Sequence, residues 1–144
     1  IHEVDLLFAL FGPACPVFVQ GVNTGQENLN MDDVFNLLFS TEDNVPGSIE
    51  LDYLSKQRRR GIEVIGENGT LEWLTRGKGK EVVSVSKNTN NRNESLYYND
   101  SYNIDDAYLK MLIDFKELGQ NLQTLKEALS VVMFVEQALS LRWK

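Results

Sequence analysis

The sequence predicts an α+β fold, with an open-faced, mainly antiparallel β-sheet and helices packed on one of its faces. An apolar run opens the chain, short strand-like segments separated by turn residues fill its middle, and two helix-like segments close it. Strands grouped together and helices grouped together are typical of α+β folds. A chain of 144 residues is long enough to bury a useful core, so we expect a single domain over residues 1–144.

A first helix is predicted over residues 1–11, because an apolar run there is stopped by Gly12 and Pro13. Alternating or β-branched segments then predict strands, and a helix is the weaker alternative for the second of them, whose apolar positions are nearly continuous. These strands are expected at residues 17–22, 33–40, 47–54, 61–66, 70–74 and 81–86.

The last four expected strands follow one another at short spacing, which predicts an antiparallel meander within one sheet of five or six strands. Glu67-Asn68-Gly69 is typical of a tight hairpin turn. The polar, asparagine-rich residues 87–101 are expected to form a loop. Helices are predicted over residues 103–118 and 124–141, the second of which opens with a capping box made by Thr124 and Glu127.

Composition and charge exclude several classes of function. The net charge of −7 argues against nucleic-acid binding, which needs a positively charged surface. No apolar stretch is long enough to span a bilayer, so no membrane partner is expected. Cys15 is the only cysteine and His2 the only histidine, so the chain can form neither an internal disulfide nor a structural zinc site, and no metal is expected. A reducing cytoplasm is the simplest location.

His2 is the strongest candidate for a catalytic group, because imidazole is the usual general acid and base. Asp5 lies three positions later and would share a helix face with His2, whereas Glu3 would point elsewhere. On spacing alone, however, a single histidine near the start of a chain is more often a surface residue than a catalyst.

The basic run from Lys56 to Arg60 and the aromatic residue Tyr53 can each be interpreted in two ways. The basic run from Lys56 to Arg60 is either a solvated segment or an anion-binding fork, and the second interpretation would make Arg58 to Arg60 the core of a free-standing anion-binding domain. Tyr53 is either a core or interface aromatic or a ligand contact. The glycines of Gly66–Gly69 lie between two expected strands, so they predict a hairpin and not a nucleotide-binding loop.

Three stretches together carry a family resemblance: His2–Leu7, which reads H-E-V-D-L-L, then Gly61–Trp73 with its G-E-N-G-T turn, and the last helix from Glu127 to Ser140. In this order, and over nearly the whole chain, they resemble the C-terminal domain of the Gfo/Idh/MocA oxidoreductases, the glucose–fructose oxidoreductase and inositol dehydrogenase family. Residues Leu51 to Arg60 also resemble a sugar-related branch of it.

The resemblance implies a two-domain enzyme in which an N-terminal Rossmann domain, absent from this chain, binds NAD or NADP. The C-terminal domain would then contact a sugar, nucleotide sugar or polyol, and would form a homo-oligomer, a dimer or tetramer, through its open sheet face. His2 matches the histidine that assists proton transfer, and Asp5 matches the acid beside it. Tyr53, Arg58 and Arg60 become expected substrate contacts.

The family's cofactor motifs would all lie before Ile1, so no cofactor-binding residue is expected in this chain. The chain also starts without a methionine, and we therefore expect a fragment or processed product that is inactive alone. The alternative is a non-catalytic interaction or dimerisation module that uses its open sheet face.

Overall fold

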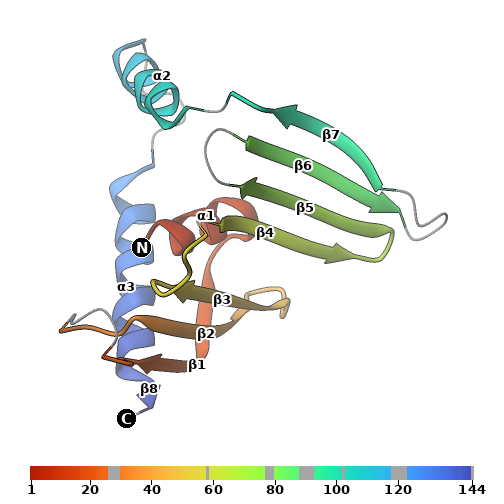
Figure 1. The fold of residues 1–144 in the computed structure, drawn as a ribbon. Coiled ribbons are helices and arrows are strands. Elements are labelled where there is room, and N and C mark those ends of the chain that lie inside the picture. Colours follow the sequence, from red (N-terminus) through yellow and green to blue (C-terminus); the bar gives the residue numbers. More distant parts are fainter. Residues whose placement is uncertain are drawn as a thin grey trace. The chain divides into compact units, whose positions relative to one another are not determined.

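The computed structural model describes most of the chain, namely residues 1–25, 30–57, 59–76, 80–87, 93–101, 103–117 and 123–143. The chain forms two compact units, which Figure 1 shows coloured along the sequence. Unit 1 combines Ile1–Ser55 with Leu122–Lys144, and unit 2 is Lys56–Asn121. Each unit contains one four-stranded sheet.

Unit 1 is built from both ends of the chain. Its elements are α1 (His2–Phe11), β1 (Ala14–Val22), β2 (Val34–Thr41), β3 (Pro46–Asp52), α3 (Leu125–Ser140) and the short β8 (Arg142–Trp143). The strand order is β3-β2-β1-β8, with β8 parallel to β1 and the other pairs antiparallel. Pro16, which cannot donate a ladder hydrogen bond, lies at a bulge in β1.

The helix α1 ends where the sequence predicts. Gly12 adopts a φ of 74°, which favours glycine, and its N–H donates to the carbonyl oxygen of Phe8 at 2.9 Å. Pro13 follows and cannot continue the helix. Val4 and Leu7, three positions apart, are buried, so this face of α1 anchors the helix to the rest of unit 1.

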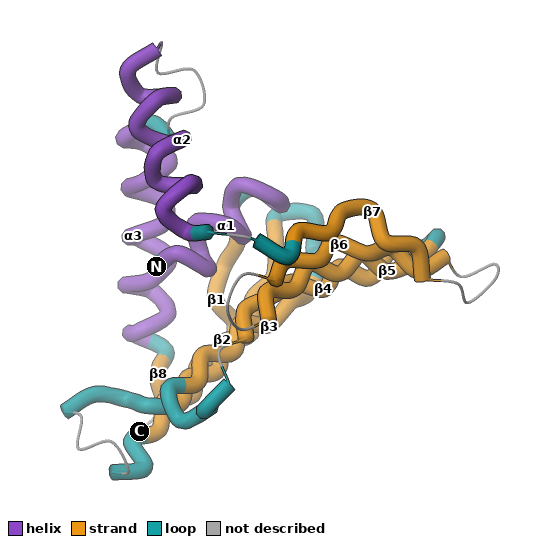
Figure 2. The backbone as a smooth tube through the Cα atoms, turned by 45° about the horizontal axis from the view of Figure 1, so that its top comes forward, coloured by secondary structure: helices purple, strands orange, loops and turns teal. Residues whose placement is uncertain are grey.

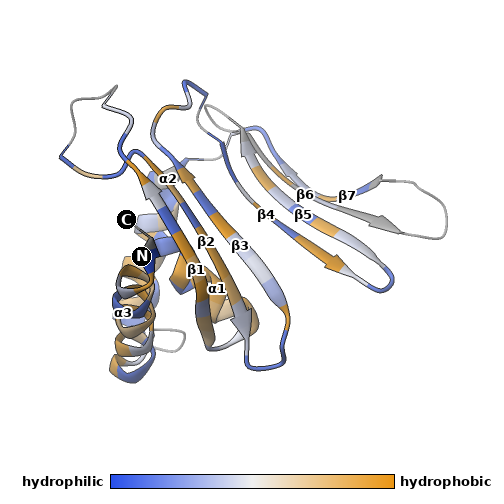
Figure 3. Cartoon of the chain, turned by 90° about the horizontal axis from the view of Figure 1, so that it is seen from below, coloured by the Kyte–Doolittle hydropathy of each residue, from blue (hydrophilic) through white to orange (hydrophobic). Residues whose placement is uncertain are grey.

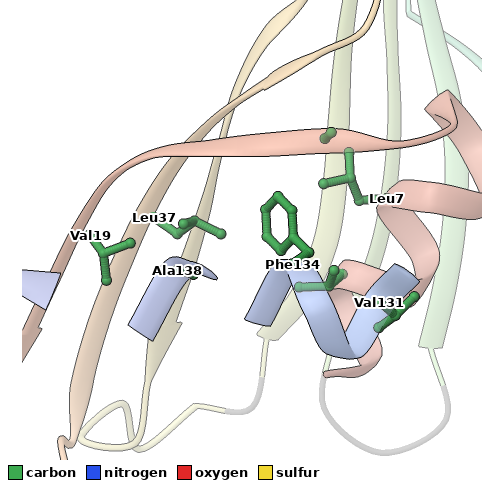
Figure 4. Close-up of a cluster of buried hydrophobic side chains, with 8 residues drawn as sticks. Leu7, Val19, Leu37, Val131, Phe134 and Ala138 are labelled. Carbon is green, nitrogen blue, oxygen red and sulfur yellow. The ribbon is translucent and has the colours of Figure 1, made fainter. Parts of the chain in front are cut away.

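The core of unit 1 lies between the two helices and one face of the sheet. Its buried residues are Val4, Leu7, Ala14, Val19, Leu37, Val131, Phe134 and Ala138. In the close-up of Figure 4, Phe134 lies between Leu37 and Leu7. The Phe134 ring also meets that of Phe8 edge-on, with centroids 5.6 Å apart. Figure 2 shows α3 next to α1, and the two helices pack against each other.

Unit 2 is a meander of four strands followed by a helix. Its elements are β4 (Arg59–Gly66), β5 (Gly69–Arg76), β6 (Lys80–Lys87), β7 (Asn93–Asn99) and α2 (Ile104–Glu117). Each strand pairs antiparallel with the next one along the chain. The pairing of Gly66 with Gly69 confirms the predicted hairpin at Glu67-Asn68. Figure 3 shows how hydrophobic and hydrophilic residues are distributed along these strands.

The α+β class is confirmed, but two details of the expected sheet are wrong. The single sheet of five or six strands is two sheets of four, because β3 pairs with β2, while the meander begins only at β4. The expected loop over residues 87–101 contains β7, whose Tyr97 and Tyr98 pair with Val83 and Val82 of β6. Residues 88–92 of that segment lie outside the described part of the chain. In the described part, no helix is both long enough and apolar enough to cross a bilayer.

Candidate functional site

The predicted catalytic pair lies in the first turn of α1, in unit 1. His2 is the first residue of the helix and is exposed to solvent, while Asp5 is half-buried. The N–H of Asp5 donates to the carbonyl oxygen of Ile1 at 3.0 Å, which closes that first turn. Residues three apart on a helix are neighbours, so the imidazole and the carboxylate share one face, with the imidazole open to a ligand.

Asp5 has a partner that sequence analysis missed. Nε2 of Gln123 donates a hydrogen bond to Oδ1 of Asp5, although the two residues are 118 positions apart. Gln123 directly precedes Thr124, the N-cap of α3. No local pattern singles out a glutamine at this position. The capping box is the one sequence signal in its neighbourhood, because it predicts where α3 begins.

The capping box itself is confirmed and fixes the chain next to Gln123. The Thr124 N–H donates to Oε2 of Glu127 at 2.7 Å, and the Glu127 N–H donates to Oγ1 of Thr124 at 3.2 Å. The backbone N–H of Thr124, and then its hydroxyl, hold the pKa of Glu127 below its ordinary value. The carboxylate therefore stays ionised at the positive end of α3, where it stabilises the start of the helix.

Tyr53 follows β3 and is 64% exposed, so it is available to a ligand or a partner and is not a core residue. Its N–H donates to the carbonyl oxygen of Asp33 at 2.9 Å. Asp33 is buried, and its carboxylate accepts hydrogen bonds from the Thr24 N–H at 3.0 Å and the Thr24 hydroxyl at 2.6 Å. The Thr24 hydroxyl is the largest cause that lowers the pKa of Asp33. This buried residue thus anchors the backbone that carries Tyr53.

The arginines belong to unit 2, whereas His2, Asp5 and Tyr53 belong to unit 1. The guanidinium of Arg60 lies over the ring of Trp73, 5.8 Å from its centroid, in a cation–π arrangement. Arg59 borders a hollow over β4 and β5 that Trp73, Glu63 and Glu72 also line. Arg58 lies outside the described residues.

The Gly66–Gly69 turn does not fit a dinucleotide site, and the described residues do not form a metal centre. A dinucleotide pyrophosphate is normally held where a strand turns into a helix, so that backbone N–H groups face the phosphates. Gly66 and Gly69 instead join the antiparallel strands β4 and β5. Among the described residues, no group of three or more His, Cys, Asp or Glu side chains could hold a metal ion.

Comparison with known proteins supplies a family. Residues 1–72, half of the chain, match the family model described as the GFO/IDH/MocA C-terminal domain. Comparison with curated proteins finds no match to the sequence.

Solved structures share the fold at low sequence identity. A biliverdin reductase from Synechocystis sp. PCC 6803, in complex with biliverdin and NADP⁺, has a TM-score of 0.72 and 13% identity, over 97% of this chain and 44% of that one. A 3-ketoreductase mutant from Actinomadura kijaniata, in complex with TDP-benzene and NADP, has a TM-score of 0.70 and 10% identity, over 98% and 45%. The WlbA dehydrogenase from Bordetella pertussis, in complex with NADH and UDP-GlcNAcA, has a TM-score of 0.59 and 18% identity, over 96% and 40%. This chain therefore spans less than half of each of these proteins.

Proposed function

This chain belongs to the GFO/IDH/MocA family, as a C-terminal domain of its oxidoreductases, and from that premise we propose that it is the substrate-binding and oligomerisation domain of an NAD(P)-dependent enzyme. The proposed substrate is a sugar, nucleotide sugar or polyol, and the reaction is hydride transfer at a CH–OH group. Two of the similar structures hold a nucleotide-linked ligand together with the cofactor, which supports this substrate class.

The observation that carries the proposal is the exposed His2 in the first turn of α1, on the same face as the half-buried Asp5. In the oxidation direction, His2 would accept the proton of the substrate hydroxyl as the carbonyl forms, and in reduction it would return that proton. An imidazole suits both steps because it can accept a proton at a ring nitrogen and return it.

The hydride acceptor would be bound by a part of the protein outside this chain, because the similar structures that hold NADP or NADH extend well beyond the part that this chain covers. This chain alone would then be inactive. Its natural location would be a reducing cytoplasm, where Cys15 is an exposed free thiol.

The first test is a fluorescence titration with NADH and NADPH, which compares this 144-residue chain with the natural full-length protein. Binding by the full-length protein and not by this chain is the expected result. Turnover is then screened with sugars, polyols and nucleotide sugars. If neither form binds a dinucleotide, the oxidoreductase proposal fails.

The second test is His2→Ala in the full-length protein. Loss of a general acid–base group should lower kcat by roughly 10²- to 10⁴-fold while the affinity for the cofactor stays nearly intact. The matched control is Asp43→Ala, in the exposed turn before β3, which should leave turnover unchanged. Unchanged turnover in His2→Ala would remove His2 from the mechanism.

The oligomer would form through the apolar face of the unit 2 sheet. Ile62 and Val64 of β4 pair with Trp73 and Leu71 of β5, so these four side chains share a face. Leu71 is 40% exposed, which leaves apolar area on that face for a second copy of the chain.

The same face also supports the second candidate function, a non-catalytic interaction module. In that case the full-length protein would associate through this face but would bind no dinucleotide. The titration described above therefore separates the two candidates.

A further inference from the structure

We propose that Gln123 is a positioning residue of the active site, which holds the carboxylate of Asp5 beside His2. The inference rests on the proposed function and adds to it a residue from the opposite end of the chain. Its basis is the hydrogen bond that Nε2 of Gln123 donates to Oδ1 of Asp5.

The packing of α1 on α3 brings these two residues together. Val4 and Leu7 of α1 and Val131 and Phe134 of α3 are buried in one cluster. The ring of Phe8 meets that of Phe134 at 5.6 Å, which fixes the two helices one turn beyond Asp5. The position of the Gln123 backbone near the first turn of α1 therefore depends on the packing of α1 against α3, while the hydrogen bond itself is exposed to solvent.

The backbone of Gln123 is also fixed by the start of α3. Gln123 is the residue before the N-cap Thr124, whose backbone and hydroxyl both bond to Glu127. This capping box fixes the backbone from which the Gln123 side chain extends. The fixed backbone leaves only the side-chain rotamers of Gln123 to be ordered when it binds Asp5.

The chemistry of an amide suits this role. The Gln123 NH₂ group is an uncharged donor, so it orients Asp5 without cancelling its negative charge. Asp5 can accept several hydrogen bonds, and one oxygen bound to Gln123 leaves the other for the imidazole N–H of His2 or for a substrate hydroxyl. A lysine or arginine at this position would neutralise the carboxylate and compete with His2 for it.

The test uses the full-length protein, NAD⁺ and NADP⁺, and a panel of glucose, myo-inositol and UDP-N-acetylglucosamine. Gln123→Ala removes the donor, Gln123→Glu replaces it by an acceptor of the same size, and Gln123→Asn keeps an amide on a shorter side chain. The matched control is Gln137→Ala, because Gln137 is also an exposed glutamine carried by the α3 segment.

Gln123→Ala is expected to lower kcat/KM for the hydroxyl substrate about tenfold, the typical effect of one lost hydrogen bond to a charged group. The KM for the cofactor and the thermal midpoint should stay unchanged, and Gln123→Asn should recover part of the loss. Asp5→Ala combined with Gln123→Ala should fall no further than Asp5→Ala alone, because Gln123 acts through Asp5.

Three outcomes would overturn the inference. Full turnover in Gln123→Ala alongside impaired turnover in Asp5→Ala would overturn it and leave the proposed function standing. So would an equal loss in the Gln137→Ala control, which would indicate a general effect on α3. Absence of turnover with every compound and both cofactors would overturn the proposed function, and this inference with it.

Discussion

Unit 1 and unit 2 differ most in how much of their apolar surface they bury. Eight side chains of unit 1 form one buried cluster that includes residues of both helices and of β1 and β2. Among the unit 2 residues whose side-chain burial the structure describes, the one buried hydrophobic side chain is Leu74, at 5% exposure. Its helix α2 leaves apolar residues such as Phe115 and Leu112 exposed, at 69% and 60%.

This difference indicates a division of roles between the units. Hydrophobic burial is the dominant favourable contribution to folding, so unit 1 has the means to hold the first turn of α1 in place by itself. Unit 2 instead presents apolar surface, which is typical of regions that bind partners. The comparison predicts that substitutions in unit 1 change stability, while substitutions on the unit 2 sheet mainly change association.

Phe134→Ala should have the largest effect, because it empties the centre of the unit 1 core. Phe134 is 2% exposed, and truncation of a buried phenylalanine lowers the free energy of unfolding by about 3–5 kcal/mol. Urea denaturation followed by circular dichroism measures the change. The control is Phe115→Ala in α2, where 69% exposure predicts a loss within about 0.5 kcal/mol. If both variants lose a similar amount of unfolding free energy, the two units do not differ in how they use their apolar residues.

Gly61→Ala tests how strongly the two units are coupled. A Cβ at Gly61 would lie 2.7 Å from the backbone oxygen of Trp73, which the β4–β5 ladder holds in place. We expect a loss of about 1–3 kcal/mol in the stability of this sheet. Gly66→Ala is the control, since its Cβ would meet its nearest neighbour at an ordinary 3.5 Å. Hydrogen exchange should accelerate in β4 and β5 and not in β1, and equal acceleration in β1 would show that the units unfold together.

Leu71→Glu places a charge on the apolar face of the unit 2 sheet and should weaken self-association. The dissociation constant of the oligomer, measured by sedimentation, should rise about tenfold. Ile65→Glu is the matched control, because Ile65 is 79% exposed and lies next to Val64, on the opposite face. If Ile65→Glu dissociates the oligomer and Leu71→Glu does not, the interface has been assigned to the wrong face.

Asp33→Asn should give the smallest effect, and one that depends on pH. Hydrogen bonds from Thr24 lower the pKa of Asp33 below 3.8, so its ionised form stabilises the fold at every pH above the unfolded pKa. That contribution is lost as the pH falls through the lower pKa of the folded state. The wild-type protein should therefore melt at a higher temperature than Asp33→Asn at neutral pH, and the difference should shrink in acid.

Thermal scans at several pH values measure this difference. Asp43→Asn, in an exposed turn, removes the same charge and should show no such convergence. A constant difference between wild type and Asp33→Asn across the pH range would mean that the charge of Asp33 contributes nothing.

The sequence was most informative where the signal is local. The end of α1 at Gly12, the hairpin at Glu67-Asn68 and the capping box at Thr124 each depend on a few adjacent residues, and all three are confirmed. Strand partners depend on distant residues instead. Alternation from Ser48 to Asp52 predicts a strand and its faces, but nothing in it says that β3 pairs with β2 and not with β4.

The strand β7 shows how tertiary pairing overrides composition. The segment contains Asn93, Ser95 and Asn99, and polar residues of this kind disfavour strands. Its composition therefore predicts a loop. The adjacent residues Leu96, Tyr97 and Tyr98 favour strands, and the ladder with β6 extends along the whole segment. A pairing partner therefore outweighs a weak local preference.

The residues of the candidate site also differ in how far the sequence predicts them. Spacing predicts that His2 and Asp5 share a helix face, but the family resemblance assigned them to catalysis, and that assignment remains a prediction. Gln123 could not be found, because its contact with Asp5 depends on the packing of α1 against α3. Tyr53 and Arg60 were chosen by resemblance, and the structure places them in different units.

The discontinuity of unit 1 has a consequence for synthesis on the ribosome. The helix α1 emerges before α3, but the residues buried with Val4 and Leu7 include Val131, Phe134 and Ala138 of α3. Until α3 emerges, α1 and the inner face of β1 expose apolar side chains in a growing polypeptide, which is a state prone to aggregation. The candidate site would therefore form only after α3 has emerged, and a nascent chain that stalls within unit 2 would carry His2 without the helix that holds it in place.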